Sequence, residues 1–174
     1  MEETKKVYII LSYSGTLVSR IIKFFTKYEY CHASVSFHKD IDKMYSFGRK
    51  TAHNPFNAGL VIETRDNEFF QTFTNTECAV LELDVTKEQY KKLKRVVKRY
   101  LKHKDEYKYD IAGLLLRIIH LKIERKNHYV CTEFVKAILE EAEIYKFDSK
   151  IVKAIDFMEM PNKKIIYNGK LLNY

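Results

Sequence analysis

Apolar and polar side chains alternate along the stretch Cys31-His32-Ala33-Ser34-Val35-Ser36-Phe37-His38. A period of two is typical of a β-strand, and it places His32 on the polar face of that strand. The polar residues 39–43 predict a turn, and residues 44–47 resume an extended pattern. We expect these two segments to pair as an antiparallel hairpin.

Further extended segments lie on both sides of this hairpin in the sequence. They are rich in β-branched, aromatic and aliphatic residues and are bounded by polar turns, which favours strands. Residues 48–57, which contain Asn54-Pro55, read as a long loop. The other predicted strands are residues 7–13, 60–64, 69–73, 78–85 and 165–172.

Helical periodicity dominates the second half of the chain. Thr86-x-x-Gln89 is a capping-box pattern, and a stripe of apolar residues with spacing i, i+3, i+4, i+7, i+8 follows at residues 93–101. Helices are also predicted at residues 17–28, 110–121 and 131–143. The sequence therefore predicts one α+β domain over residues 1–174, with helices packed against an antiparallel sheet.

Composition narrows the classes of function. The chain has 174 residues, 46% of them hydrophobic, which suits one globular domain with a sizeable core. Its five glycines form neither a dinucleotide-binding fingerprint nor a P-loop. The net charge is +8, but the basic residues are mostly lysine and no RNA-recognition signature accompanies them, so we expect no nucleic-acid partner.

Location and redox state can also be anticipated. The first residues lack the pattern of a signal peptide, and no apolar segment approaches the roughly 20 residues of a membrane span, so we expect a cytoplasmic protein without a transmembrane segment. The cysteines Cys31, Cys78 and Cys131 are odd in number and form no C-x-x-C motif, which favours free thiols.

Cys131 and His32 are the candidate nucleophile and base. Cys131 opens a predicted helix, where unpaired N–H groups and the helix dipole stabilise a thiolate. Each residue also has a plain structural interpretation, as a core thiol and a hydrogen-bonded histidine. A zinc site built from Cys31, His32, His128 and Cys131 is disfavoured, because adjacent strand residues point to opposite faces.

Two motifs resemble a known family. His32-Ala33-Ser34-Val35-Ser36-Phe37 with Met44-Tyr45-Ser46-Phe47-Gly48 is similar to the His-bearing hairpin of NlpC-type papain-like cysteine hydrolases. Tyr129-Val130-Cys131-Thr132-Glu133-Phe134-Val135 resembles the nucleophile helix of the YiiX-like branch. The order of His before Cys is that of the circularly permuted members, which include the lecithin:retinol acyltransferase-like enzymes.

The resemblance, which covers about residues 7–140, implies a permuted papain-like fold, with a sheet or half-barrel packed against helices. It also implies that Cys131 attacks a carbonyl carbon and forms a thioester intermediate. His32 would take the thiol proton and later donate a proton to the leaving group. A third residue would orient His32. Ser46 stands at the family's position, whereas Glu63 is an acid in an apolar run, and we favour Glu63. Tyr109 looks like the family's oxyanion-hole tyrosine, and Tyr107 and Tyr129 are the competing candidates.

We therefore expect a cysteine hydrolase, of amidase, peptidase or acyltransferase type, that needs no cofactor. Its substrate would be a small-molecule, peptide or lipid-like amide or acyl compound. The alternative is a non-catalytic binding domain of the same fold. In that case the basic surface of residues 91–104 and the loop 48–57 would hold an anionic or protein partner.

Overall fold

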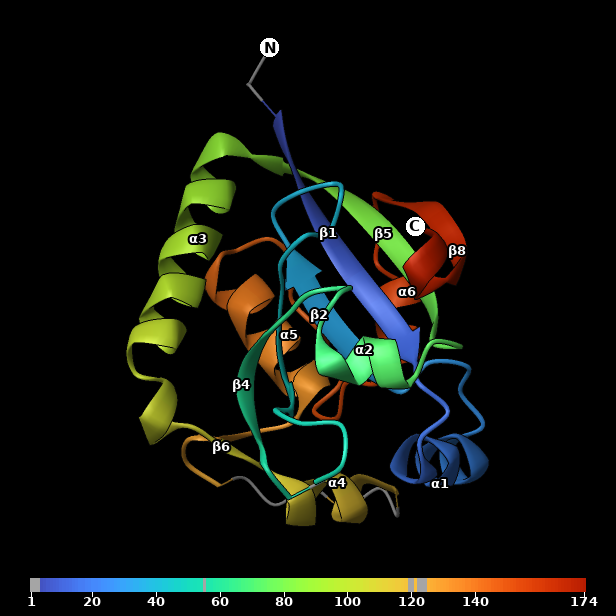
Figure 1. The fold of residues 1–174 in the computed structure, drawn as a ribbon. Helices are drawn as coiled ribbons and strands as arrows, with labels where there is room; N and C mark the ends of the chain where they lie inside the picture. The colour runs from blue at the N-terminus through green and yellow to red at the C-terminus, as the bar shows by residue number, and fades with distance from the viewer. Residues whose placement is uncertain (1–3, 55, 119–120, 122–124) are drawn as a thin grey trace.

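The computed structural model describes residues 4–54, 56–118, 121 and 125–174. Its centre is a six-stranded sheet in the order β4-β3-β2-β1-β5-β8, in which every neighbouring pair is antiparallel (Figure 1). A short parallel pair, β6 (Lys108–Tyr109) and β7 (His128–Tyr129), is separate from it. The strands of the sheet are β1 (Thr4–Tyr13), β2 (His32–Ser36), β3 (Met44–Arg49), β4 (Ala58–Glu63), β5 (Glu77–Thr86) and β8 (Lys163–Lys170).

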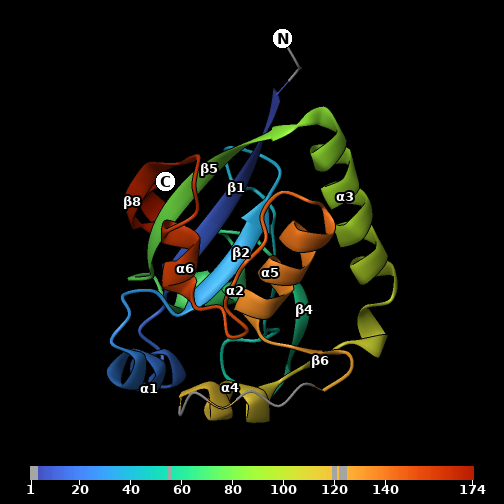
Figure 2. The same cartoon turned by 180° about the vertical axis from the view of Figure 1, so that it is seen from behind.

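Helices lie on both faces of the sheet and at one end of it. Seen from behind, α5 and α6 cross the face of β1 and β2, with α3 beside them (Figure 2). The short helix α2 lies on the opposite face, while α1 and α4 lie together at one end (Figure 1). The helices are α1 (Leu17–Thr26), α2 (Glu68–Thr72), α3 (Lys87–Lys102), α4 (Ile111–Ile118), α5 (Cys131–Glu141) and α6 (Ala154–Met158).

Both faces of the sheet are buried. Along β1, Val7 and Ile9 join the large core beneath α3, α5 and α6, whereas Tyr8 and Ile10 join a smaller cluster with Phe70 of α2. The polar face of β2 is therefore also covered, and Ser36 is fully buried. The predicted α+β class and antiparallel sheet are confirmed, including the hairpin of β2 and β3.

Residues 69–73 were predicted as a strand, and this prediction is wrong. Residues 69–72 belong to α2 and Phe73 is its C-cap residue, because the side chain of Asn67 accepts a hydrogen bond from the Phe70 N–H at 2.9 Å and caps the start of the helix. Helix α6 carries no strong periodic signal and was missed. Helix α4 covers Ile111–Ile118 of the helix predicted at residues 110–121, of which residues 119–120 lie outside the described part.

Helix α3 forms as its pattern predicts. The Thr86 side chain caps its first turn and Gln89 completes the capping box, while Leu93, Val97 and Tyr100 are buried. Two of its basic residues form ion pairs at and just after the C-terminal end of α5: Arg99 pairs with Glu141, the last residue of the helix, and Lys92 pairs with Glu143. Two residues of the basic surface thus form ion pairs that hold α3 against the end of α5.

Within the described residues, none of the helices is both long and apolar enough to cross a lipid bilayer.

Candidate active site

Cys131 is the first residue of α5 and is 5% exposed. Because the first N–H groups of a helix have no intrahelical acceptor, its backbone N–H is available to a ligand. The preceding residue is Val130, whose side chain has no polar atom to cap the helix. The thiol therefore lies where both the helix dipole and a free N–H favour negative charge.

His32 begins β2 and lies between Cys131 and Glu63. Its Nε2 is 2.9 Å from Oε1 of Glu63, the last residue of β4. The side chain of Cys131 also interacts with the imidazole and favours its protonation, while the Cys131 Sγ lies 3.8 Å from the carbonyl oxygen of Cys31, to which the thiol can donate. With Nε2 engaged by the carboxylate, Nδ1 is the nitrogen left for the thiol. The side chains of Cys131, His32 and Glu63, from three different elements, thus lie next to one another in that order.

The charge state of His32 follows from these neighbours. Burial opposes its protonation, but the carboxylate of Glu63 and the sulfur of Cys131 together outweigh burial and raise the pKa of His32 well above its usual value. The side chain of His32 is still 24% exposed, so a reacting molecule can reach it. The site favours an imidazolium beside Cys131.

Of the two candidate orienting residues, Glu63 contacts the imidazole of His32, whereas the hydroxyl of Ser46 bonds a backbone carbonyl. The hydroxyl of Ser46 donates to the carbonyl of Ala33 at 2.6 Å within the hairpin. Gly48 allows Glu63 to approach the ring, because a methyl group there would lie 3.1 Å from Glu63 Oε1 and 3.3 Å from His32 Cε1. The second oxygen of Glu63 is buried and has no hydrogen-bond partner among the described residues.

Tyr109 lines the same pocket as Cys131, His32 and Glu63. Burial first, and then the nearby sulfur of Cys131, raises the pKa of its phenol. Its hydroxyl therefore stays protonated and can donate a hydrogen bond at neutral pH. The two competing tyrosines serve the core instead: Tyr129 bonds the hydroxyl of Tyr100 at 3.2 Å, and the ring of Tyr107 packs on that of Tyr100.

The other two cysteines, Cys31 and Cys78, are thiols with raised pKa values. Cys31 lines the pocket and its thiol donates to the carbonyl of Ser19. Burial, with the nearby Cys131, raises the pKa of Cys31 to about 11, and burial raises that of Cys78 to about 12. Both remain neutral thiols near pH 7.

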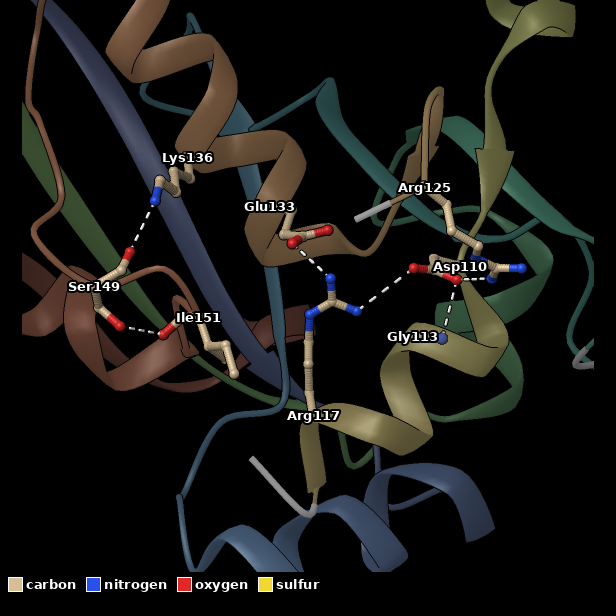
Figure 3. A network of polar contacts seen from close by, with 8 residues as sticks. All are labelled: Asp110, Gly113, Arg117, Arg125, Glu133, Lys136, Ser149 and Ile151. Carbon is tan, nitrogen blue, oxygen red and sulfur yellow. Dashed lines mark hydrogen bonds and ion pairs between the residues drawn. The ribbon is translucent and has the colours of Figure 1, made fainter. Parts of the chain in front are cut away.

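A buried polar network holds the start of α5 in place (Figure 3). Arg117 of α4 pairs with Glu133 in the first turn of α5 at 2.5 Å and lies 3.6 Å from Asp110. Asp110 is 1% exposed, accepts from the N–H of Gly113 at 2.9 Å and also pairs with Arg125. Sequence reasoning missed this network; its sole signal was a charged residue at the end of the apolar run 111–116.

Two clefts meet at Cys131. The polar cleft is the pocket just described, and it also contains Ser12, Thr16 and Arg49. The apolar cleft runs along α1 and the segment before α6, and it shares Cys31 and Cys131 with the polar cleft. Its apolar lining includes Phe25, Tyr30, Val130, Ile151 and Val152.

The residues weighed for zinc have other surroundings. The Nδ1 of His128 donates to the carbonyl of Lys126 at 2.8 Å, and His32 is held by Glu63. In the described part of the chain, the one group of three potential metal ligands is the exposed set His38, Asp40 and Asp42.

Comparison with known proteins returns no matching family model and no matching curated sequence for this chain.

Proposed function

We propose that the protein is a cysteine hydrolase whose nucleophile is Cys131, with His32 as proton carrier and Glu63 as orienting residue. One observation carries this proposal: the His32 imidazole lies between the Cys131 thiol at a helix start and a buried Glu63 carboxylate. A thiol is activated when a base contacts the nucleophile and a third residue orients that base.

The chemistry follows from these positions. Cys131 transfers its proton to His32, and the Sγ thiolate attacks the carbonyl carbon of an amide or related acyl bond. In this proposal the backbone N–H of Cys131 and the hydroxyl of Tyr109 donate to the developing oxyanion, which is supported by the position of Cys131 at the helix start and by Tyr109 in the lining of the same cleft. His32 then protonates the leaving group, which leaves a thioester. Water, or another nucleophile in an acyltransferase, releases the acyl group.

The proposal includes the permuted papain-like fold. In support of it, the His-bearing hairpin β2-β3 precedes the nucleophile helix α5 in the chain, and α5 packs against β2 and β3. Fold alone does not select a substrate. We therefore restrict the proposal to an acyl or amide substrate.

The test is the rate at which iodoacetamide labels each cysteine between pH 4 and pH 9, read by peptide mapping. Cys31 and Cys78 are internal references, because their raised pKa values keep them protonated throughout. An ordinary thiol has a pKa of about 8.5 and reacts slowly below that pH. We expect Cys131 to react rapidly well below this pH, and we expect His32→Ala to remove the rapid reaction.

Labelling of Cys131 no faster than that of Cys31 in the folded protein would refute the proposal. A non-catalytic binding domain would then be the better interpretation. Far-UV circular dichroism of His32→Ala shows whether the variant keeps its fold. If Cys131 reacts as expected, Cys131→Ser serves as the inactive reference for a screen of ester, thioester and amide substrates.

A further inference from the structure

Arg49 is a cation in the polar cleft that the mechanism does not use. It ends β3, one residue after Gly48, and lines the cleft together with Cys131 and Tyr109. Its Nη2 donates a long hydrogen bond, 3.4 Å, to the hydroxyl of Thr16. Among the residues that the structure describes, no carboxylate lies within ion-pair distance of Arg49.

Two other arginines of the chain, one largely buried and one more exposed, do have carboxylate partners. Arg117 is largely buried and pairs with Glu133, while the more exposed Arg99 makes two hydrogen bonds to Glu141. Burial lowers the pKa of Arg49, yet a guanidinium remains charged in proteins. A partly buried guanidinium without an anion has lost hydration that a carboxylate would restore. An anionic group that enters the cleft can therefore form an ion pair with Arg49.

The location of Arg49 relates this anion to the reaction. Arg49, Tyr109 and Cys131 line the same cleft, and the charges of Arg49 and Arg117 both lower the pKa of the Tyr109 hydroxyl against the effect of burial. The hydroxyls of Ser12 and Thr16 line the same cleft and add hydrogen-bonding capacity. The apolar cleft adjoins this one at Cys131 and has Phe25 and Val130 in its lining.

We propose that Arg49 binds a carboxylate of the substrate. The substrate class is then an acyl compound with an acidic group near the scissile carbonyl and an apolar group that fits the second cleft. A carboxylate suits the site because a single guanidinium binds it through two parallel hydrogen bonds. This inference rests on the proposed function, since it assumes that the reacting carbonyl lies at Cys131.

The experiment compares two reagents that alkylate the same thiol, iodoacetate and iodoacetamide. They carry the same leaving group and differ in whether a carboxylate or a neutral amide is present. Rates at Cys131 are divided by the rates with free cysteine, which removes the intrinsic difference between the reagents. We expect a preference for iodoacetate of about tenfold, the scale of a charge-assisted hydrogen bond.

Variants assign this preference to Arg49 and not to general charge. Arg49→Gln should lose it, whereas Arg49→Lys should keep part of it. Arg20→Gln is the matched control, because Arg20 is exposed on α1 and its side chain bonds a backbone carbonyl. His32 is present in all these proteins, so its charge cancels from the comparison.

The outcomes separate the two proposals. Rapid labelling of Cys131 with the same reagent ratio in wild type and Arg49→Gln overturns the carboxylate site alone. Slow labelling by both reagents overturns the proposed function as well. A measurement without variants guards against misfolding: sodium acetate should protect Cys131 of the wild-type protein from iodoacetamide, and acetamide at equal concentration should not. Equal protection by the two would contradict the inference.

Discussion

At the scale of the residue, the hydrogen bond from His32 to Glu63 controls the charge of the imidazole. Glu63→Gln keeps the shape of the side chain but removes the carboxylate that raises the pKa of His32. We expect the pKa of His32 to fall in this variant and the rapid labelling of Cys131 to weaken about tenfold or more, since fewer molecules hold the imidazolium. Two-dimensional NMR of the histidine ring protons measures the pKa directly.

The same substitution has a pH-dependent effect on stability. A raised pKa in the folded state stabilises the protein fully below the unfolded value of about 6.5, and this contribution is lost as the pH rises through the folded pKa of His32. The loss in unfolding free energy for Glu63→Gln should therefore exceed about 1 kcal/mol at pH 5.5 and shrink towards pH 9. Urea denaturation at both pH values measures it, and a constant difference would contradict this explanation.

Gly48 is a second residue-scale constraint on the site. Alanine there would bring its methyl group to 3.1 Å from Glu63 and 3.3 Å from His32, so one of the two side chains must shift. We expect Gly48→Ala to slow the labelling of Cys131 about tenfold with little loss of fold, because activated geometry is sensitive to small displacements. Gly59→Ala is the control, since its methyl would meet only the flexible end of Lys50.

The sequence could predict Cys131 and His32 because each carries a local pattern, a helix start and an alternating strand. It left Ser46 and Glu63 open, since the choice depends on which side chain reaches the imidazole across neighbouring strands. The sequence could not show that Arg49 has no acidic partner in the folded protein. Missing partners are a property of three-dimensional packing, which no spacing of residues reveals.

At the scale of the element, α5 is positioned by its buried ion pair with α4. Arg117→Met should destabilise the protein by about 3–5 kcal/mol, because Asp110 and Glu133 remain buried with one cation fewer. Arg99→Met is the matched control: its pair with Glu141 is on the surface and should cost at most about 1 kcal/mol. Thermal and urea unfolding compare the two, and equal losses would argue against a special role for the network.

The elements differ in how well the sequence predicts them. Helix α3 has a capping box and a long apolar stripe, so two independent signals agree. Helix α2 is five residues long and rich in phenylalanine, which favours a strand by propensity. The cap from Asn67 and the packing of Phe70 in the smaller core cluster outweigh that propensity. Short elements depend on such single contacts.

At the scale of the whole molecule, the site exists only when the two halves of the chain are packed together. Phe134 of α5 is fully buried and contacts the rings of Phe47 on β3 and Tyr100 on α3, each with ring centroids 5.3 Å apart. Phe134→Ala removes this junction and should cost about 3–5 kcal/mol. Phe24→Ala, at a residue 77% exposed on α1, should change stability by less than about 0.5 kcal/mol.

A urea titration then tests whether site and core form one cooperative unit. His32 and Cys131 come from the first and second halves of the chain, and their contact requires α5 to be packed on β2. Rapid labelling of Cys131 should therefore disappear at the urea concentration at which far-UV circular dichroism reports unfolding, and Phe134→Ala should lower both midpoints equally. If labelling were lost at a clearly lower concentration, α5 would open as a separate unit, and the activated thiol would depend on local rather than global stability.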